Sequence, residues 1–211
     1  MTTMLYQGHG SYRLTLDDGT VVYVDPSLGE GYDVPADLVL VTHEHPDHNV
    51  VDKMPHAPGC QVLRAADFLD GGQQLSLQAK GVRMTAVQAC NAYHPVDECV
   101  GIVLEFDGIR FYAAGDTSAT QDMESGRLAA LELDYATFPA DGYYNMDVAE
   151  ASRCAQLVAA KHSIPLHLVP VHDVSCAVLF DEEKAAAFDA PGKLVLHPGE
   201  SLAEVEPADA V

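Results

Sequence analysis

The sequence predicts an α/β protein in which two β-sheets pack face to face with helices on the outside. Two observations indicate this class. The first half of the chain consists mostly of short apolar runs of strand length separated by turn residues, and after residue 120 apolar residues recur at helical spacing. Because no linker or low-complexity stretch divides the 211 residues, we expect a single domain over residues 1–211.

The strands of the first half are predicted from apolar and β-branched runs. Residues 13–16 and 21–24 flank the turn sequence Asp17-Asp18-Gly19, which predicts a β-hairpin. Residues 38–41 form a continuous apolar run, as expected of a strand that is buried on both faces. Further strands are predicted at 61–64, 74–78, 82–88, 99–106 and 109–114, with Asp107-Gly108 as a second hairpin turn.

Helical spacing predicts two longer helices in the second half, over residues 123–133 and 147–162. In the second of these, Asp147 suits the N-cap position, Glu150 follows three residues later, and His162 is expected at the C-terminal end. The remaining elements are predicted as strands at 133–138, 163–168 and 194–196, a short helix at 181–188 and a frayed, exposed tail from residue 200 onward.

The charge balance excludes several classes of function. The chain has 11 Lys and Arg against 32 Asp and Glu, which gives a net charge of −21 with histidine neutral. A chain so poor in cations cannot neutralise many phosphates, so nucleic-acid binding is not expected. An anionic membrane surface would repel it as well.

The N-terminal sequence and the spacing of the cysteines give two further expectations. The N-terminal residues lack the charged and apolar segments of a signal peptide, and no apolar stretch approaches about 18 residues, so we expect a cytoplasmic protein. The five cysteines are widely spaced and form no CxxC pair, which indicates free thiols rather than disulfides or a thiolate zinc site.

The most informative segment follows the buried run and reads Thr-His-Glu-His-Pro-Asp-His-Asn over residues 42–49. On an extended strand exit, His43 and His45 point the same way and can bind one cation through imidazole nitrogens. A proline suits the first turn of a helix, whose start would present Asp47 and His48 to a second cation. The spacing therefore predicts two metals close enough to share one water. A merely polar, His-rich loop is the alternative.

Further ligands are expected where other apolar strands end. His94 precedes the strand predicted at 99–106, Asp116 follows an apolar strand and a glycine, and His167 stands at the exit of another apolar run. Each residue alone would more often cap a turn. Their occurrence together with the 42–49 segment favours a metal site.

These elements together resemble the metallo-β-lactamase superfamily, specifically its small metal-dependent hydrolase branch related to the ascorbate-phosphate lactonases. The likeness extends over nearly the whole chain, and its two specific motifs are HEHPDH and Gly115-Asp116-Thr117. The supporting segments, in order, are Gly8-His9-Gly10-Ser11-Tyr12, Val24-Asp25-Pro26, Ile164-Pro165-Leu166-His167 and Pro198-Gly199-Glu200. Unlike secreted β-lactamases, the chain has no export signal, which disfavours antibiotic hydrolysis.

The resemblance implies a four-layer αββα sandwich of two mixed sheets with outer helices, and a site along one edge of the paired sheets. It implies the following ligand set: His43, His45 and His94 on one metal, Asp47, His48 and His167 on the other, and Asp116 bridging both. The fold hosts many chemistries, so the resemblance does not transfer a substrate.

Four further residues are candidates for supporting roles or substrate contact. By resemblance, His9 should approach the site, and Asp25 could orient a ligand histidine, although turn chemistry explains both as well. Tyr143, in the loop 141–145, could line the substrate pocket. His172 with Asp173 could form an extra acid/base pair, but a polar loop is the stronger interpretation.

We therefore predict a metal-dependent hydrolase that uses a hydroxide held by two divalent cations to cleave a small ester, lactone or phosphoester. Zinc is the expected metal, and manganese or iron would also suit the ligands. Asp47 and Asp116 are the predicted catalytic residues. Asp47 could accept a proton as well as bind a metal, and Asp116 would bridge both metals. The alternatives are a di-iron redox protein and a non-catalytic metal-dependent binding module. We expect a small-molecule partner, with neither nucleic acid nor membrane, while homo-oligomerisation stays open.

Overall fold

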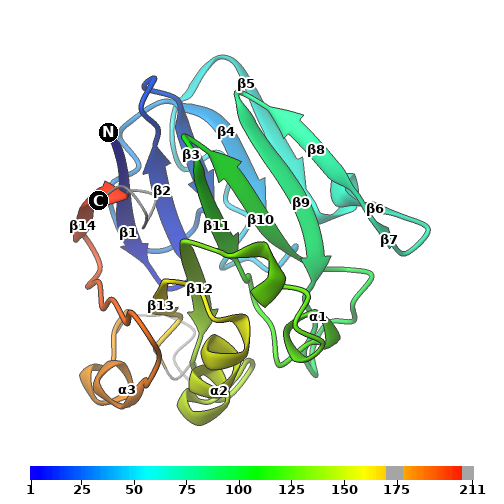
Figure 1. Cartoon of the computed structure of the whole chain (residues 1–211). Coiled ribbons are helices and arrows are strands. Elements are labelled where there is room, and N and C mark those ends of the chain that lie inside the picture. Colours follow the sequence, from blue (N-terminus) through cyan, green and yellow to red (C-terminus); the bar gives the residue numbers. More distant parts are fainter. Residues whose placement is uncertain (170–177, 206–211) are drawn as a thin grey trace.

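Two six-stranded β-sheets face each other in the protein (Figure 1). The computed structural model describes residues 1–169 and 178–205. The first sheet has the strand order β14-β1-β2-β3-β4-β5. Its strands are β1 (Thr2–Gly8), β2 (Ser11–Thr15), β3 (Val21–Val24), β4 (Ala36–Val41), β5 (His56–Arg64) and β14 (Ser201–Val205). It is a mixed sheet, because β3, β4 and β5 run parallel and the other neighbours run antiparallel.

The second sheet repeats this plan with the order β13-β12-β11-β10-β9-β8. Its strands are β8 (Ser76–Ala79), β9 (Val82–Gln88), β10 (Val100–Phe106), β11 (Ile109–Ala113), β12 (Tyr135–Pro139) and β13 (His162–Leu166). Here β11, β12 and β13 are parallel and the other pairs are antiparallel. A small hairpin of β6 (Leu69–Asp70) and β7 (Gln73–Gln74) stands apart from both sheets.

Both predicted hairpins are present. The β2–β3 pair closes around Asp17-Asp18-Gly19, and β10–β11 closes around Asp107-Gly108. Asp107 and Gly108 have φ values of 48° and 78°, which suits the two-residue turns that match strand twist. The Asp107 carboxylate also accepts hydrogen bonds from Thr2 Oγ1 at 2.6 Å and from the Asp17 backbone N–H at 2.9 Å, so it ties the two sheets together.

The main core lies between the two sheets. Alternate residues of each strand point inward, for example Met4 and Leu14 from the first sheet and Leu104 and Phe111 from the second, and all four are fully buried. This packing sets the distance between the sheets. The loops that carry the histidines and aspartates are thereby fixed at one shared edge.

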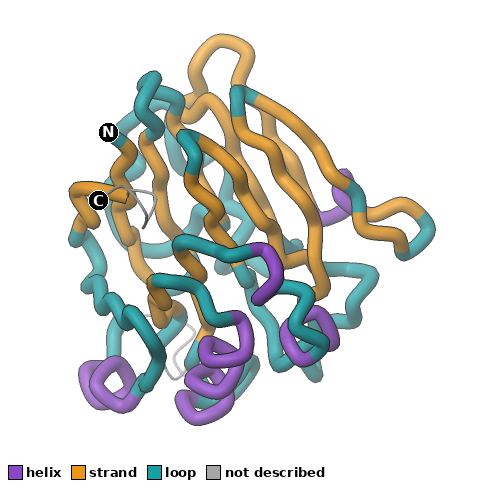
Figure 2. The backbone as a smooth tube through the Cα atoms, viewed as in Figure 1, coloured by secondary structure: helices purple, strands orange, loops and turns teal. Residues whose placement is uncertain are grey.

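Three α-helices and two short 3₁₀ helices complete the described part of the chain, and in Figure 2 the α-helices gather on the side of β12 and β13. They are α1 (Gln121–Glu124), α2 (Val148–Val158), α3 (Glu182–Ala187), η1 (Ala65–Phe68) and η2 (Ala129–Leu131). A second apolar cluster joins the outer face of the second sheet to α1 and α2, through residues such as Tyr112, Phe138, Met123 and Cys154.

The four-layer arrangement implied by the resemblance is only partly seen. In the described ranges, the outer face of the first sheet is covered by loop segments instead of an α-helix: Tyr32 and Met54, from the loops after β3 and β4, pack on Tyr23 and Val39. The two mixed sheets are as predicted, whereas the described α-helices lie against the second sheet.

Several predicted elements were wrong in detail. The helix expected over 123–133 breaks after α1, because Gly126 takes a φ of 79°. Helix α2 ends at Val158, with Ala159 left-handed at a φ of 53°, so His162 begins β13 instead of ending a helix. Residues 194–196 form no strand, and the adjacent Lys193 makes a single bridge to Ser163.

The N- and C-terminal segments also differ from the prediction. Strand β1 was not expected, and residues 201–205, predicted as frayed tail, pair with β1 as β14. Both segments become strands because each satisfies the other's backbone groups at the edge of the first sheet. No helix in the described residues is long and apolar enough to span a bilayer.

The core between the sheets yields a stability prediction. Replacing Leu104 by Ala should lower the free energy of unfolding by about 2–5 kcal/mol, because a fully buried leucine leaves a cavity. Val178→Ala is the control, since Val178 is 61% exposed and its truncation should change stability by less than about 0.5 kcal/mol. Urea unfolding curves measure both, and equal effects would show that the inter-sheet core is misplaced.

Candidate metal centre

Histidine and aspartate side chains gather at the edge where the two sheets meet, in two groups of four and in a smaller group of Asp25, His43 and His48 that overlaps both. The first group comprises His43, His45, His94 and Asp116, and the second comprises His9, Asp47, His48 and His167. Within each group, one potential ligand atom from every residue lies within 4.8 Å of the others. The seven predicted ligands are therefore brought together, and His9 joins them.

The fold places these residues at strand ends. His43 follows β4 and Asp116 follows β11, and the two segments touch where Gly115 lies against Thr42. Gly115 has a φ of +64°, and a Cβ atom there would lie 2.8 Å from Thr42 Oγ1. Only glycine allows this close approach, which brings a carboxylate from the second sheet to a histidine from the first.

Asp116 lies between the two groups. Its Oδ2 is 3.9 Å from His43 Nε2 in the first group and 3.6 Å from His167 Nε2 in the second. Its Oδ1 is 3.4 Å from His48 Nε2. The carboxylate is only 6% exposed, so it is shared by buried imidazoles on both sides.

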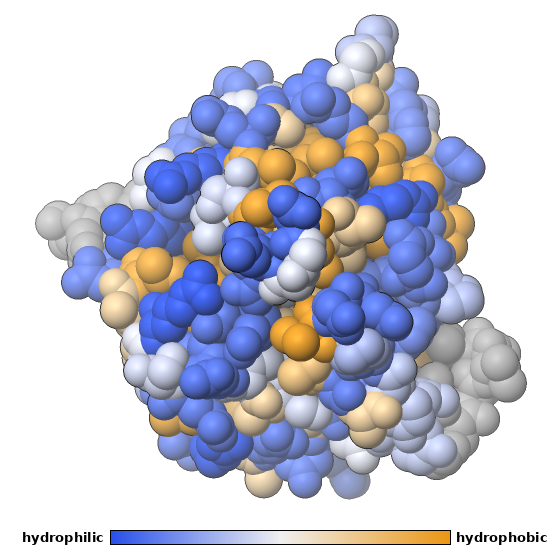
Figure 3. All heavy atoms as spheres, turned by 90° about the vertical axis from the view of Figure 1, so that its right-hand side faces the viewer, coloured by the Kyte–Doolittle hydropathy of each residue, from blue (hydrophilic) through white to orange (hydrophobic). Residues whose placement is uncertain are grey.

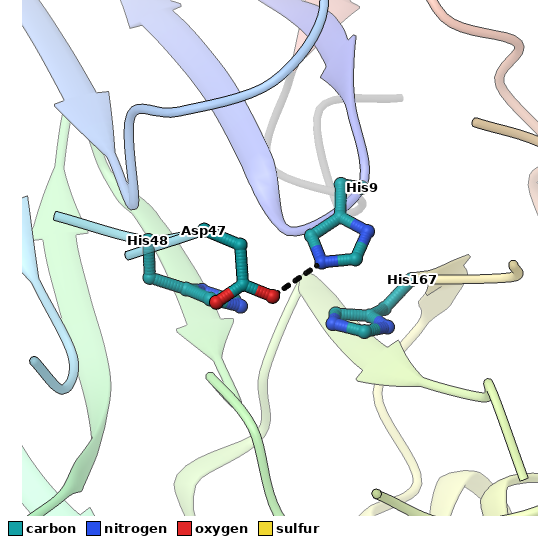
Figure 4. Close-up of side chains that lie close together, drawn as sticks. All are labelled: His9, Asp47, His48 and His167. Carbon is teal, nitrogen blue, oxygen red and sulfur yellow. Dashed lines mark hydrogen bonds and ion pairs between the residues drawn. The ribbon is translucent and has the colours of Figure 1, made fainter. Parts of the chain in front are cut away.

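The second group is shown in Figure 4. His9 comes from the turn after β1, and its Nε2 lies 3.0 Å from Asp47 Oδ2, the contact marked by the dashed line. The His9 ring also lies against the His167 ring, with 3.6 Å between centroids. The His9 carbonyl accepts hydrogen bonds from His167 N–H at 2.9 Å and from Tyr6 Oη at 3.0 Å, which fixes the turn.

Asp25 holds two residues of the site that follow strands of the first sheet, Thr42 and His48. Its carboxylate accepts hydrogen bonds from the backbone N–H and the hydroxyl of Thr42, each at 2.7 Å, and lies 3.1 Å from His48 Nδ1. This contact leaves His48 Nε2 directed at Asp116. Gly10 lies beside the His48 ring, and a glycine is needed there because a Cβ atom would lie 2.5 Å from that ring.

His94 is held by two neighbours that the sequence analysis did not single out. Its Nδ1 lies 3.0 Å from Cys99 Sγ, and its Nε2 lies 3.2 Å from Asn91 Nδ2. Burial raises the pKa of Cys99 to about 12, so the thiol stays protonated and can donate to the Ala89 carbonyl at 2.8 Å while accepting from His94.

Burial and mutual charge decide the protonation states of the imidazoles. Burial, followed by the charge of His48, lowers the pKa of His43 to about 2. Burial and the charge of His167 lower the pKa of His9 to about 4, and burial also lowers the pKa of His94. These three imidazoles are therefore neutral at pH 7, the form that binds a metal.

The carboxylates behave in the opposite way. Burial would raise the pKa of Asp116, but the charges of His167, His48 and His43 outweigh it and hold the pKa well below the usual range. Asp47 is likewise held low, because its hydrogen bond to His9 and the charge of His48 outweigh burial. The His48 imidazole differs from the other three. Burial alone would lower its pKa, but Asp116 and Asp25 raise the pKa to about 10.

The unpartnered nitrogen atoms of the site test whether a metal fits it. Among the residues that the structure describes, His43 Nε2, His48 Nε2 and His167 Nε2 are buried and have no hydrogen-bond partner. Leaving such atoms unpartnered costs about 1–3 kcal/mol each. All three rings surround an ionised carboxylate, and imidazole with carboxylate is a donor set that zinc and similar divalent cations prefer. The residues present therefore fit metal binding.

The remaining candidates are placed less centrally. Tyr143 is 48% exposed on the loop after β12, where its ring stacks on Tyr93 with 6.5 Å between centroids. His172 lies outside the described residues. Asp141 was not predicted as a site residue, yet its Oδ2 is 3.3 Å from His167 Nδ1. Its position directly after an apolar strand, the pattern that singled out Asp116, could have revealed it.

Comparison with known proteins identifies the family. Residues 3–167 match the model of the β-lactamase superfamily domain. The chain belongs to the metallo-β-lactamase superfamily of metal-dependent hydrolases. Within this superfamily it is 32% identical over 197 residues to a UPF0173 metal-dependent hydrolase of Nitratidesulfovibrio vulgaris, an alignment that covers 79% of this chain and 80% of the relative.

Solved structures share the superfamily fold. A metallo hydrolase from Ignicoccus hospitalis aligns with a TM-score of 0.69 at 20% identity, over 96% of this chain and 98% of that protein. A diiron β-hydroxylase from Streptomyces venezuelae aligns with the same TM-score of 0.69 at 15% identity, over 95% of this chain and 54% of that one. Both likenesses concern the fold.

The contact between Cys99 and His94 yields a prediction for metal affinity. Cys99→Ala removes the group that orients the His94 ring, so the affinity for zinc should fall about 10- to 100-fold. Cys99→Ser should retain most of the affinity, because a hydroxyl can donate to the same carbonyl and accept from the same ring nitrogen. Titration against a competing chelator measures both.

Cys154→Ala is the matched control, since Cys154 is also buried but lies on α2, in the apolar cluster on the outer face of the second sheet. If Cys99→Ala binds zinc as tightly as this control, the thiol does not orient His94.

Proposed function

We propose that the protein is a hydrolase whose two groups of side chains hold two divalent cations, with Asp116 as the ligand common to both. The observation that carries this proposal is the position of the Asp116 carboxylate. It lies 3.9 Å from His43 in one group and 3.4 and 3.6 Å from His48 and His167 in the other. A carboxylate has two oxygens, so one residue can serve two ions.

The first proposed ligand set is the first group, His43, His45, His94 and Asp116. The second set takes Asp47, His48 and His167 from the second group and adds Asp116 in place of His9. Two cations at these positions supply a water of lowered pKa and polarise an oxygen of the substrate. Zinc suits this donor set, and manganese or iron is compatible with it.

Asp47 is proposed to accept a proton during the reaction. Its side chain is 33% exposed, whereas Asp116 is 6% exposed, so Asp47 is the carboxylate of the site that solvent can reach. Its lowered pKa keeps it ionised at neutral pH. His9 holds Asp47 Oδ2 at 3.0 Å, and we assign His9 this positioning role.

The proposed substrates are small esters, lactones or phosphoesters. A net charge of −21 opposes long polyanions, because so few cations can replace the counterions of a nucleic acid. A site that holds two cations can still attract the reacting group of a small molecule. A di-iron redox function is the alternative to distinguish, and iron content with visible absorption of the purified protein separates the two.

Metal content is the first test of the proposal. After reconstitution with zinc, the protein should hold close to two ions per chain by elemental analysis, and removing them with a chelator should lower the melting temperature. Stability falls because the buried imidazole nitrogens lose their partners. A content below about half an ion per chain would reject the metal centre.

Asp116→Asn is the second test, because the amide keeps the shape of the side chain but removes its charge. Hydrolysis of generic ester and lactone substrates should fall more than about 100-fold while the circular dichroism spectrum is unchanged. His56→Ala is the control, since the exposed His56 ring contacts only the Val51 carbonyl among the described hydrogen bonds. Equal, small effects of the two substitutions would mean that the site lies elsewhere.

A further inference from the structure

A pocket of about 460 Å³ opens directly beside the first group of ligands. His43, His45 and His94 form its inner wall, so a molecule in this pocket would have one end at the proposed metal position. His43 Nε2, which is buried and has no hydrogen-bond partner in ranges 1–169 and 178–205, belongs to this wall. The volume suits a small organic group, since ligand sites span about 300–1,000 Å³.

Part of the pocket lining is apolar. Ala65 and Ala66 come from η1, and Leu69 begins the β6–β7 hairpin. Figure 3 faces the side of the molecule that carries this hairpin and shows a run of apolar side chains bordered by polar ones. This wall offers hydrocarbon contact and no hydrogen-bonding side chain to an occupant.

The rim of the pocket is acidic. Glu44, Asp97 and Glu98 line it, and no lysine or arginine from the described ranges does so. The charge of Glu44 is already compensated, because Arg64 Nη1 lies 2.9 and 2.7 Å from its two carboxylate oxygens. In the described part of the chain, Asp97 and Glu98 have no cationic side chain within ion-pair distance, so they leave a local negative potential at the rim.

We propose that this pocket binds the part of the substrate next to the reacting bond, and that it selects a small apolar group that is uncharged or cationic over one that is anionic. The inference rests on the proposed hydrolase function and narrows its substrate class. The apolar wall favours a hydrocarbon group, and Asp97 and Glu98 repel a second anionic group while attracting a cationic one.

The test uses three p-nitrophenyl esters with acyl chains of matched shape. One chain ends in a trimethylammonium group. The second ends in tert-butyl, which is the uncharged isostere of trimethylammonium, and the third ends in a carboxylate. With the zinc-loaded protein at low salt, kcat/KM should be at least about tenfold higher for the cationic and uncharged esters than for the anionic ester. In the double variant Asp97→Asn/Glu98→Gln, the gap between the cationic and anionic esters should shrink at least about fivefold.

Asp33→Asn/Glu132→Gln is the matched control. It removes the same two charges from side chains that are each 84% exposed and do not line the pocket, so it should leave the preference unchanged. A second readout is independent of catalysis. Calorimetric titration of the metal-free protein should show binding of butyltrimethylammonium but not of hexanoate, and the Asp97/Glu98 double variant should lose that binding.

The outcomes separate the two proposals. If neither these esters nor generic lactones and phosphoesters are hydrolysed in a metal-dependent way, the proposed function fails, and the titration alone decides the pocket. If esters are hydrolysed without preference for charge, or if both double variants change the preference equally, the proposed function stands and the pocket inference is overturned. Preferred turnover of the anionic ester would also overturn it.

Discussion

The structure depends on keeping ionised carboxylates and imidazoles together in a buried place. Asp116 is 6% exposed and lies within 4 Å of three imidazoles, while Asp25 holds the far side of His48 at 3.1 Å. Buried charge is tolerated only when it is paired. The backbone adapts to this requirement, because His9, Asp25 and His167 all take left-handed conformations, with φ values of 57°, 46° and 52°. Such conformations persist only where surrounding contacts hold them.

Each sheet supplies part of the centre, and the core between the sheets sets its dimensions. The first sheet delivers Asp25, His43 and His48 through the ends of β3 and β4, and the second delivers Asp116 and His167 through the ends of β11 and β13. In the proposed ligand sets, each cation takes ligands from both sheets. The inter-sheet packing of residues such as Leu14 and Leu104 therefore has a functional consequence, because a shift of one sheet would separate Asp116 from the histidines of the other.

Local sequence predicted most of the strands and most of the residues that gather at the site. The hairpin turns at 17–19 and 107–108 depend on neighbouring residues, so they could be predicted, whereas the helix expected to begin at Pro46 is a turn. The β1–β14 pairing could not, because it joins residues about 200 positions apart, and neither segment has a strong strand pattern of its own. The contact of Cys99 with His94 was likewise not predicted, whereas the resemblance did lead us to expect His9 near the site.

The proposed function requires two cations that share one buried carboxylate. Anomalous X-ray diffraction at the zinc absorption edge, from crystals grown with zinc, tests this requirement most directly. The account predicts two anomalous peaks, one among His43, His45 and His94 and the other among Asp47, His48 and His167, with the Asp116 carboxylate between them. A single peak, or peaks away from Asp116, would contradict it.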